Sequence, residues 1–316
     1  MEFKGTGMTT RNTITALALA ATLAACAPAT PLAEAPPAPD VRFAVTDTAD
    51  YNPRSVNAVP SDPPTLKVAY GSASDRQYGE LRMPQGKGPF PVAVIVHGGC
   101  WAGMGGTSNV AALASFLARN GVAVWTPSYR ELGSDGGWPN TFADWAQGFG
   151  YVKTLAQDYP LDLKRITVMG HSAGVTPAMW LGTGNKGDAV VKGELPAVQA
   201  AVALDGPLSL GGFVGADAMI CGKPVIAPLM GGTPDEVPAR FAMVDPLVNK
   251  PLIKRLLVID GALPDPDPAV LDGLRAQGIA VEVIRVDQEE HFNLLVPGTA
   301  DFALIGPALL KIAGGR

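Results

Sequence analysis

The chain has 316 residues, of which 47% are hydrophobic and 17% are charged, and its formal net charge at pH 7 is −5. This composition is typical of a soluble enzyme with a large core, and it excludes the basic stripe that nucleic-acid binding requires. Three scattered histidines cannot form a zinc site unaided, so we predict an activity that needs neither a metal nor a cofactor.

The N-terminus has the pattern of an export signal. Lys4 and Arg11 form a basic start, and the apolar run over residues 14–25 is too short to span a bilayer. The run ends in Leu-Ala-Ala-Cys, with Cys26 last, and this ending resembles a bacterial lipobox. The resemblance implies that Cys26 carries the lipid anchor of an exported bacterial lipoprotein, and Ala27 permits sorting from the periplasmic side to the outer membrane.

A plain secretory signal, with Cys26 incidental, remains the alternative for residues 1–26. Residues 1–7 are either an upstream start or an addition to the natural chain. Residues 27–64 are rich in proline and alanine, a composition that buries little apolar surface, so we predict an extended tether. Residues 65–316 are then one catalytic domain, near the upper size for a single hydrophobic core.

Within this domain short apolar runs alternate with longer helical segments. The alternation predicts an α/β fold with a mostly parallel sheet and helices on both faces. Residues 92–96 and 256–259 are apolar without alternation, as expected of strands buried on both faces. The predicted strands are 66–70, 92–96, 122–126, 166–169, 198–204, 256–259 and 281–286, and the predicted helices are 110–119, 141–157, 173–181, 269–277 and 303–312.

The most informative stretch is 164–181, in which a strand meets a Gly-x-Ser-x-Gly turn that opens into a helix. Gly170 and Gly174 flank Ser172 and relieve the crowding of a sharp turn, the geometry called a nucleophile elbow. The helix N-terminus behind Ser172 directs unpaired N–H groups, that of Ala173 in particular, toward charge developing on a substrate. Ser172 is therefore the candidate nucleophile.

A strand ending in His97-Gly-Gly, the Gly-His-Ser-Ala-Gly elbow and a His-Phe pair near the C-terminus together resemble the α/β-hydrolase superfamily. The His-Gly-Gly-x-Trp variant is similar to kynurenine formamidase and to small feruloyl-esterase-like carboxylesterases. The resemblance covers nearly all of residues 65–316 and implies a Ser-His-Asp triad. It departs from the family at Val175, where related enzymes often have another glycine.

The base must follow the serine in the chain order of this fold. His97 ends a strand and His171 is the neighbour of Ser172 on the elbow, so His291 remains as the candidate base. The acid is expected in the loop after the strand 256–259. The family pattern does not decide between Asp265 and Asp267 there, and Asp265 is nearer to the expected place.

The oxyanion of an acyl-transfer intermediate needs two or more N–H donors. The candidates are the backbone groups of Gly99, Cys100 and Ala173, and Trp101 beside them is a candidate wall of the substrate pocket. Cys100 and Cys221 would meet an oxidising compartment after export, so a disulfide is possible, although an isolated cysteine usually behaves as a small buried hydrophobe. Its formation stays open here.

These residues predict a serine hydrolase that cleaves small-molecule esters through an acyl-enzyme. The alternatives are a formamide hydrolase like kynurenine formamidase and, in another class, a non-catalytic surface lipoprotein that binds its ligand. Residues 205–252 contain seven glycines, so we expect loops with one or two short helices and no large cap. A site so thinly covered favours acetyl to butyryl or compact aryl esters. Contact with a membrane is expected only through a lipid on Cys26.

Overall fold

The computed structural model describes residues 2, 45–184, 190–286 and 291–315. The chain divides into two units, Met1–Asp40 and Val41–Arg316, and the fold below is that of the second. The predicted signal peptide and the first part of the predicted tether therefore lie outside the described residues, apart from Glu2. Among the helices that are described, none combines the length and the apolar character needed to cross a membrane.

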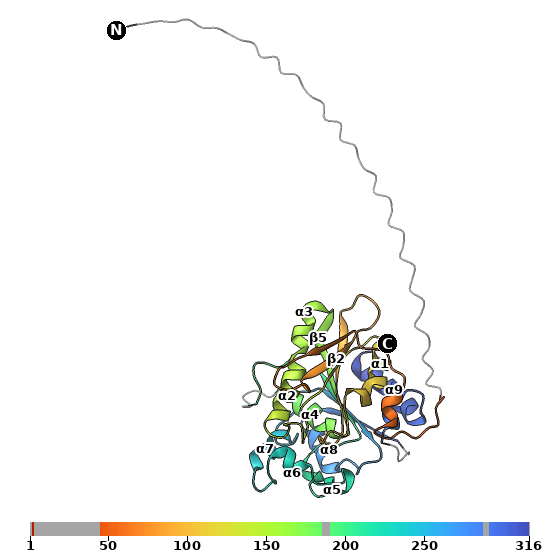
Figure 1. The fold of residues 1–316 in the computed structure, drawn as a ribbon, viewed down its shortest axis with the longest axis vertical. Helices are drawn as coiled ribbons and strands as arrows, with labels where there is room; N and C mark the ends of the chain where they lie inside the picture. The colour runs from red at the N-terminus through yellow and green to blue at the C-terminus, as the bar shows by residue number, and fades with distance from the viewer. Residues whose placement is uncertain (1, 3–44, 185–189, 287–290, 316) are drawn as a thin grey trace. The chain divides into compact units, whose positions relative to one another are not determined.

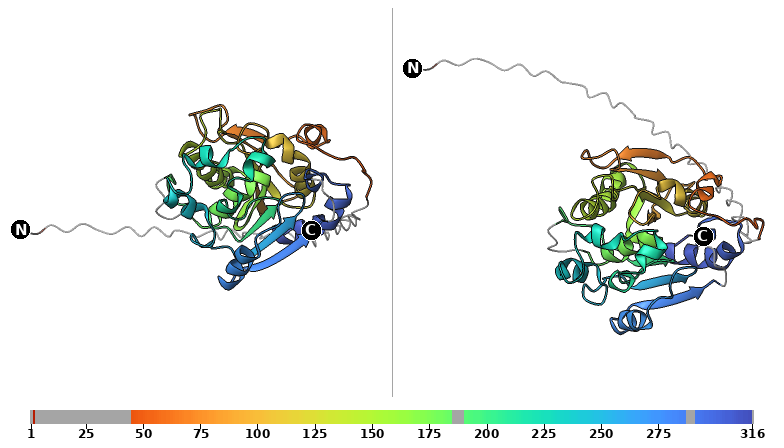
Figure 2. Two further views of the ribbon diagram at one scale, coloured as in Figure 1. Left: turned by 90° about the horizontal axis from the view of Figure 1, so that it is seen from below. Right: turned by 60° about the horizontal axis from the view of Figure 1, so that its bottom comes forward.

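An eight-stranded sheet in the order β1-β2-β4-β3-β5-β6-β7-β8 runs through the described domain. β1 pairs with β2 and β2 with β4 in antiparallel fashion, and the other neighbours are parallel. Figure 2 shows the orange strands β1 and β2 toward one edge and the blue strand β8 at the other. The strands are β1 (Leu66–Ala69), β2 (Tyr78–Arg82), β3 (Phe90–Val96), β4 (Ala123–Pro127), β5 (Leu161–His171), β6 (Ala200–Leu204), β7 (Arg255–Asp260) and β8 (Ala280–Arg285).

Helices cover both faces of this sheet, which confirms the predicted α/β architecture (Figure 1). One core joins the sheet to α2, α3, α4 and α8, and a second core lies between the sheet and α1 and α9. The helices are α1 (Ala111–Arg119), α2 (Asn140–Gly150), α3 (Val152–Asp158), α4 (Val175–Leu181), α5 (Asp217–Ile220), α6 (Ile226–Met230), α7 (Pro238–Val244), α8 (Pro268–Ala276) and α9 (Ala300–Ala313).

Two local differences from the predicted elements have simple causes. The strand β2 was not predicted because its sequence, Tyr-Gly-Glu-Leu-Arg, has neither an apolar run nor a clear alternation. The predicted helix 141–157 is divided at Gly150 and Tyr151 into α2 and α3, and glycine inside a helix lowers its stability. The segment 205–252 contains three short α-helices, α5 to α7, and thus no large cap.

Residues 45–64 are not part of an extended tether, so the predicted domain start at residue 65 is too late. Val56, in the short 3₁₀ turn η1 (Ser55–Ala58), is buried in the second core. Asp62 forms two hydrogen bonds with Arg119 on α1, at 2.6 and 2.7 Å. The Tyr51 N–H donates to Oδ1 of Asn293 at 2.8 Å. These few contacts hold the segment against the domain. The prediction missed them because the segment has a low apolar content.

Candidate active site

Ser172 lies at the turn between β5 and α4, in the 3₁₀ turn η3 (Ser172–Gly174), with a positive φ of 55°. A Cβ on Gly170 would come within 2.0 Å of the Gly174 carbonyl oxygen, and one on Gly174 within 2.2 Å of the Val96 oxygen. Both positions therefore require glycine. The strained backbone presents the serine at the carboxyl edge of the sheet, as the motif predicts.

His291 and Ser172 line one cleft. His291 Nδ1 is 2.6 Å from Oδ2 of Asp205, the residue directly after β6. Because a carboxylate only accepts, Nδ1 carries the proton and Nε2 is left with a free lone pair. The ring is thus held in the tautomer that can take a proton from a serine hydroxyl.

The acid predicted in the loop after β7 is wrong, since the carboxylate on His291 is that of Asp205. Asp265 instead pairs with the exposed Arg285 at 2.8 Å, and Asp267 caps α8 by accepting from the Ala269 N–H. The reason lies in the sheet order, because β6 is the direct neighbour of β5 and therefore brings Asp205 next to the elbow. No residue pattern in the sequence had singled out Asp205.

The loop after β7 nevertheless belongs to the site through its backbone. The N–H groups of Gly261, Ala262 and Leu263 donate to the carboxylate of Asp205 at 3.3, 3.0 and 3.1 Å. Burial alone would raise the pKa of Asp205, but the hydrogen bonds that its carboxylate accepts from His291 and from the Leu263 N–H lower it. The carboxylate therefore remains ionised beside the imidazole.

The two other histidines have structural positions. His171 lies against His291 with ring centroids 4.4 Å apart, and its Nε2 donates to the His291 carbonyl oxygen at 3.0 Å. His97 is fully buried and stacks on Tyr129, whose hydroxyl donates to the His97 carbonyl oxygen at 2.9 Å. His171 thus orients the His291 loop, and His97 supports the loop that follows β3.

The three candidate oxyanion donors border the Ser172 side chain. Gly99 and Cys100 line the cleft that also holds Ser172 and His291, and Ala173 lines an adjoining cavity with Ser172. Gly99 has φ 113°, and a Cβ there would lie 2.4 Å from the Gly105 nitrogen, so the tight turn needs glycine. All three predicted donors therefore belong to residues that line the two hollows at Ser172.

Cys100 and Cys221 form a disulfide with their Cα atoms 6.0 Å apart. The bond joins the loop after β3 to the end of α5, 121 residues later in the chain. The disulfide, which the sequence left open, is therefore formed.

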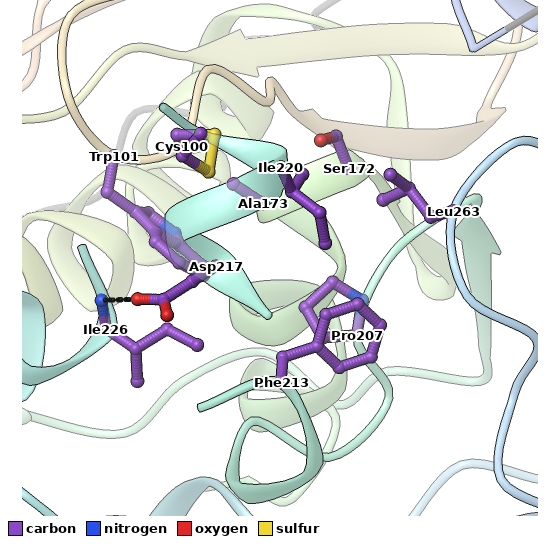
Figure 3. A pocket seen from close by; sticks show the side chains of 11 residues that line it. Cys100, Trp101, Ser172, Ala173, Pro207, Phe213, Asp217, Ile220, Ile226 and Leu263 are labelled. Carbon is purple, nitrogen blue, oxygen red and sulfur yellow. Dashed lines mark hydrogen bonds between the residues drawn. A yellow bond between two sulfur atoms is a disulfide. The ribbon is translucent and has the colours of Figure 1, made fainter. Parts of the chain in front are cut away.

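Two hollows of different size meet at Ser172. The first is an apolar cavity of about 30 Å³ that Trp101, Phe213 and Ile220 line together with the disulfide (Figure 3). The second is the cleft of about 300 Å³ on the His291 side, where Pro53, Met104 and Phe292 form much of the wall. Trp101 is 3% exposed and lines the small cavity, as predicted for a pocket wall.

The buried histidines predict a loss of stability in mild acid. Burial lowers the pKa of His97 to about 4, and burial together with the nearby His291 lowers the pKa of His171 to about 3. An unfolded chain binds these protons near pH 6.5, so the free energy of unfolding falls as the pH drops from about 6.5 toward 4. We expect about 1.4 kcal/mol per pH unit for each histidine.

Denaturant unfolding of the protein and of a His97→Gln variant at pH 7, 6, 5 and 4.5 checks this expectation. In the variant, the free energy of unfolding should change with pH about half as steeply over this range, because His171 still contributes. The carboxyl groups whose pKa lies below 3.8, such as Asp62, contribute mainly below this range. Equal slopes for the two proteins would contradict the assignment to His97.

Several solved structures with the same architecture are those of esterases. The comparison with proteins of curated function found no match. A truncated carbohydrate esterase from gut microbiota has a TM-score of 0.64 and 18% identity, covering 81% of this chain and 99% of its own. Esterase B from Lactobacillus rhamnosis, inhibited by a tributyrin phosphonate, has a TM-score of 0.65 and 16% identity, covering 83% and 90%. Esterase 2 from Thermogutta terrifontis with bound propionate has a TM-score of 0.61 and 15% identity, covering 81% and 96%.

At these identities the likeness establishes the fold, which is that of the α/β-hydrolases, as the sequence motifs predict. The BD-FAE family model matches residues 80–251, which are more than half of the chain. The match contains the elbow with Ser172, the loop with Gly99 and Cys100, and Asp205, whereas His291 lies beyond its end. The chain therefore belongs to the BD-FAE family.

Proposed function

We propose that this protein is a serine carboxylesterase for small esters, with Ser172, His291 and Asp205 as its triad. The observation that carries the proposal is the short hydrogen bond from His291 Nδ1 to Asp205 at the mouth of the cleft that holds Ser172. The likeness to esterases and the membership of the BD-FAE family support the same reaction type.

In this mechanism Ser172 Oγ attacks the acyl carbon while His291 Nε2 takes the hydroxyl proton. The N–H groups of Gly99, Cys100 and Ala173 bind the oxyanion, and Asp205 stabilises the imidazolium that forms. His291 then gives the proton to the departing alkoxide. Water attacks the acyl-enzyme with His291 again as the base, which releases the acid and restores Ser172.

We place the two halves of the ester in the two hollows according to their sizes. The apolar cavity of about 30 Å³ has room for roughly two water molecules, which suits a short acyl group. The cleft of about 300 Å³ takes the larger alcohol half. Its described lining is formed by apolar side chains, glycine backbone, Asn109, Ser172, His171 and His291.

Hydrolysis of soluble p-nitrophenyl esters with two to ten acyl carbons tests the proposal. We expect the highest kcat/KM with acetyl to butyryl esters and a fall from about six carbons upward, because each methylene left in water forgoes about 0.8 kcal/mol. An aryl ester panel and N-formylkynurenine belong in the same experiment. A preference for the formamide would indicate the related amidase reaction, and an optimum at ten carbons would contradict the small acyl site.

We also propose that the mature protein is anchored by lipid on Cys26, since the apolar run ends in Leu-Ala-Ala-Cys. A Cys26→Ser variant is expected to lose lipid attachment and normal processing, because the thioether needs the cysteine sulfur. Mass spectrometry of the N-terminal peptide from membrane fractions measures both. An unmodified N-terminus at another residue of the native protein would refute the anchor.

A further inference from the structure

The Cys100–Cys221 disulfide connects two parts of the active site that are far apart in sequence. Cys100 follows Gly99 in the loop after β3, and its backbone N–H is one of the proposed oxyanion donors. Cys221 directly follows α5, whose Ile220 lines both the apolar cavity and the large cleft. The sulfur atoms themselves lie in the wall of the apolar cavity, as Figure 3 shows for Cys100.

The helix α5 has little else to hold its outer end. It contains four residues, and a helix of this length is marginal without tertiary contacts. Asp217 fixes its first turn, because this buried carboxylate accepts the N–H groups of Val225 and Ile226 at 2.8 and 2.9 Å. Met219, in contrast, is 83% exposed. Besides Asp217, the disulfide is the covalent attachment of α5 to the loop after β3.

The loop on the other side of the bond has a strained backbone. Cys100 and Trp101 adopt φ values of 52° and 54°, a region that residues other than glycine rarely occupy unless their surroundings hold them there. The Leu132 N–H holds one side by donating to the Trp101 carbonyl oxygen at 2.6 Å. The disulfide holds the other side, at Cys100, whose N–H is one of the proposed oxyanion donors.

We propose that the Cys100–Cys221 disulfide determines the acyl-length limit of this site, by fixing α5 as the end wall of the acyl cavity. The bond also keeps the Cys100 N–H in the oxyanion position. This inference rests on the proposed esterase function. Without the bond, α5 moves away from Trp101 and Ser172, so longer acyl chains are accepted and catalysis on the acetyl ester weakens.

The test measures kcat/KM of the full chain and of Cys221→Ala on p-nitrophenyl acetate, butyrate, hexanoate and octanoate. The octanoate-to-acetate ratio should rise about tenfold or more, since newly buried methylenes each contribute about 0.8 kcal/mol and 1.4 kcal/mol is a factor of ten. Tris(2-carboxyethyl)phosphine should produce the same change in the native chain. The phosphine supplies two electrons and takes the oxygen of one water to become the phosphine oxide, while the two protons of that water convert the disulfide into two thiols.

The matched control is Cys221→Ala treated with the same phosphine, which should not change further because it has no disulfide to reduce. An Ile220→Ala variant with the disulfide intact tests the wall independently of folding, and it should accept hexanoate and octanoate better than the native chain does. An unchanged acyl-length profile in Cys221→Ala overturns the proposal. If that variant does not fold, an unchanged profile in Ile220→Ala overturns it instead. If the native chain hydrolyses no ester at all, the esterase function itself fails and this inference falls with it.

Discussion

Ester hydrolysis is expected to fall by about 10⁴-fold or more when Ser172 is replaced by alanine, and by a similar factor in His291→Ala, because the triad acts as a unit. Neither change should unfold the protein. Alanine tolerates the φ of 55° at position 172 about as well as serine does, and His291 lies in a loop at the surface of the cleft. Steady-state kinetics on p-nitrophenyl acetate measures the effect, and thermal melting checks the fold.

A Ser209→Ala variant is the matched control for the nucleophile. Ser209 is a half-buried serine four residues after Asp205, but its hydroxyl donates to Asp245 at 3.2 Å and Ser209 does not line either hollow. It should keep its activity. If Ser172→Ala hydrolysed the ester at a comparable rate with an unchanged melting curve, the proposed mechanism would be wrong.

Replacing Asp205 by asparagine is expected to lower kcat by about 10³- to 10⁴-fold. Asparagine keeps the shape but has no charge to stabilise the imidazolium, and its amide group favours the wrong tautomer of His291. The substitution also removes a charged acceptor from the N–H groups of Ala262 and Leu263, so a lower melting temperature should accompany the loss. Activity measured at a temperature where both proteins are fully folded separates the catalytic loss from the loss of stability.

Asp265→Asn is the decisive comparison, since Asp265 is the nearer of the two predicted acids to the place where the family pattern expects one. Its ion pair with Arg285 is exposed, and exposed pairs contribute little to stability. Activity and melting temperature should both stay close to those of the native chain. A large loss in Asp265→Asn with little change in Asp205→Asn would return the acid to the loop after β7.

The sequence predicted those parts of the site that depend on a short stretch of chain or on a simple count of residues. Gly170 and Gly174 around Ser172 indicate a tight turn, because a Cβ at either position would collide with the backbone of such a turn. His291 could be identified because the chain has only three histidines and the other two stand at strand ends. The α/β fold followed in the same way from buried runs such as 92–96.

The partner of His291 depends on which strands become neighbours, and a single sequence does not show this. Asp205 ends a buried run and precedes Gly206, where a Cβ would lie 2.2 Å from the Ser172 carbonyl oxygen. A carboxylate directly after a parallel strand, followed by a glycine, is a signal that could have been weighed. The disulfide was open for a similar reason, because the spacing of Cys100 and Cys221 in the chain says nothing about their distance in space.

Asp205 accepts its hydrogen bonds from the main chain of the loop after β7, which leaves the side chains of this loop free to vary. This loop supports the catalytic carboxylate with main-chain N–H groups, which most substitutions preserve. The side chains of Ala262, Leu263, Pro264 and Asp265 are therefore not bound to one identity by the chemistry, and Leu263 borders both hollows. A library randomised at these four positions should yield esterases with altered substrate preference and an intact triad, which makes the loop a natural first target for redesign.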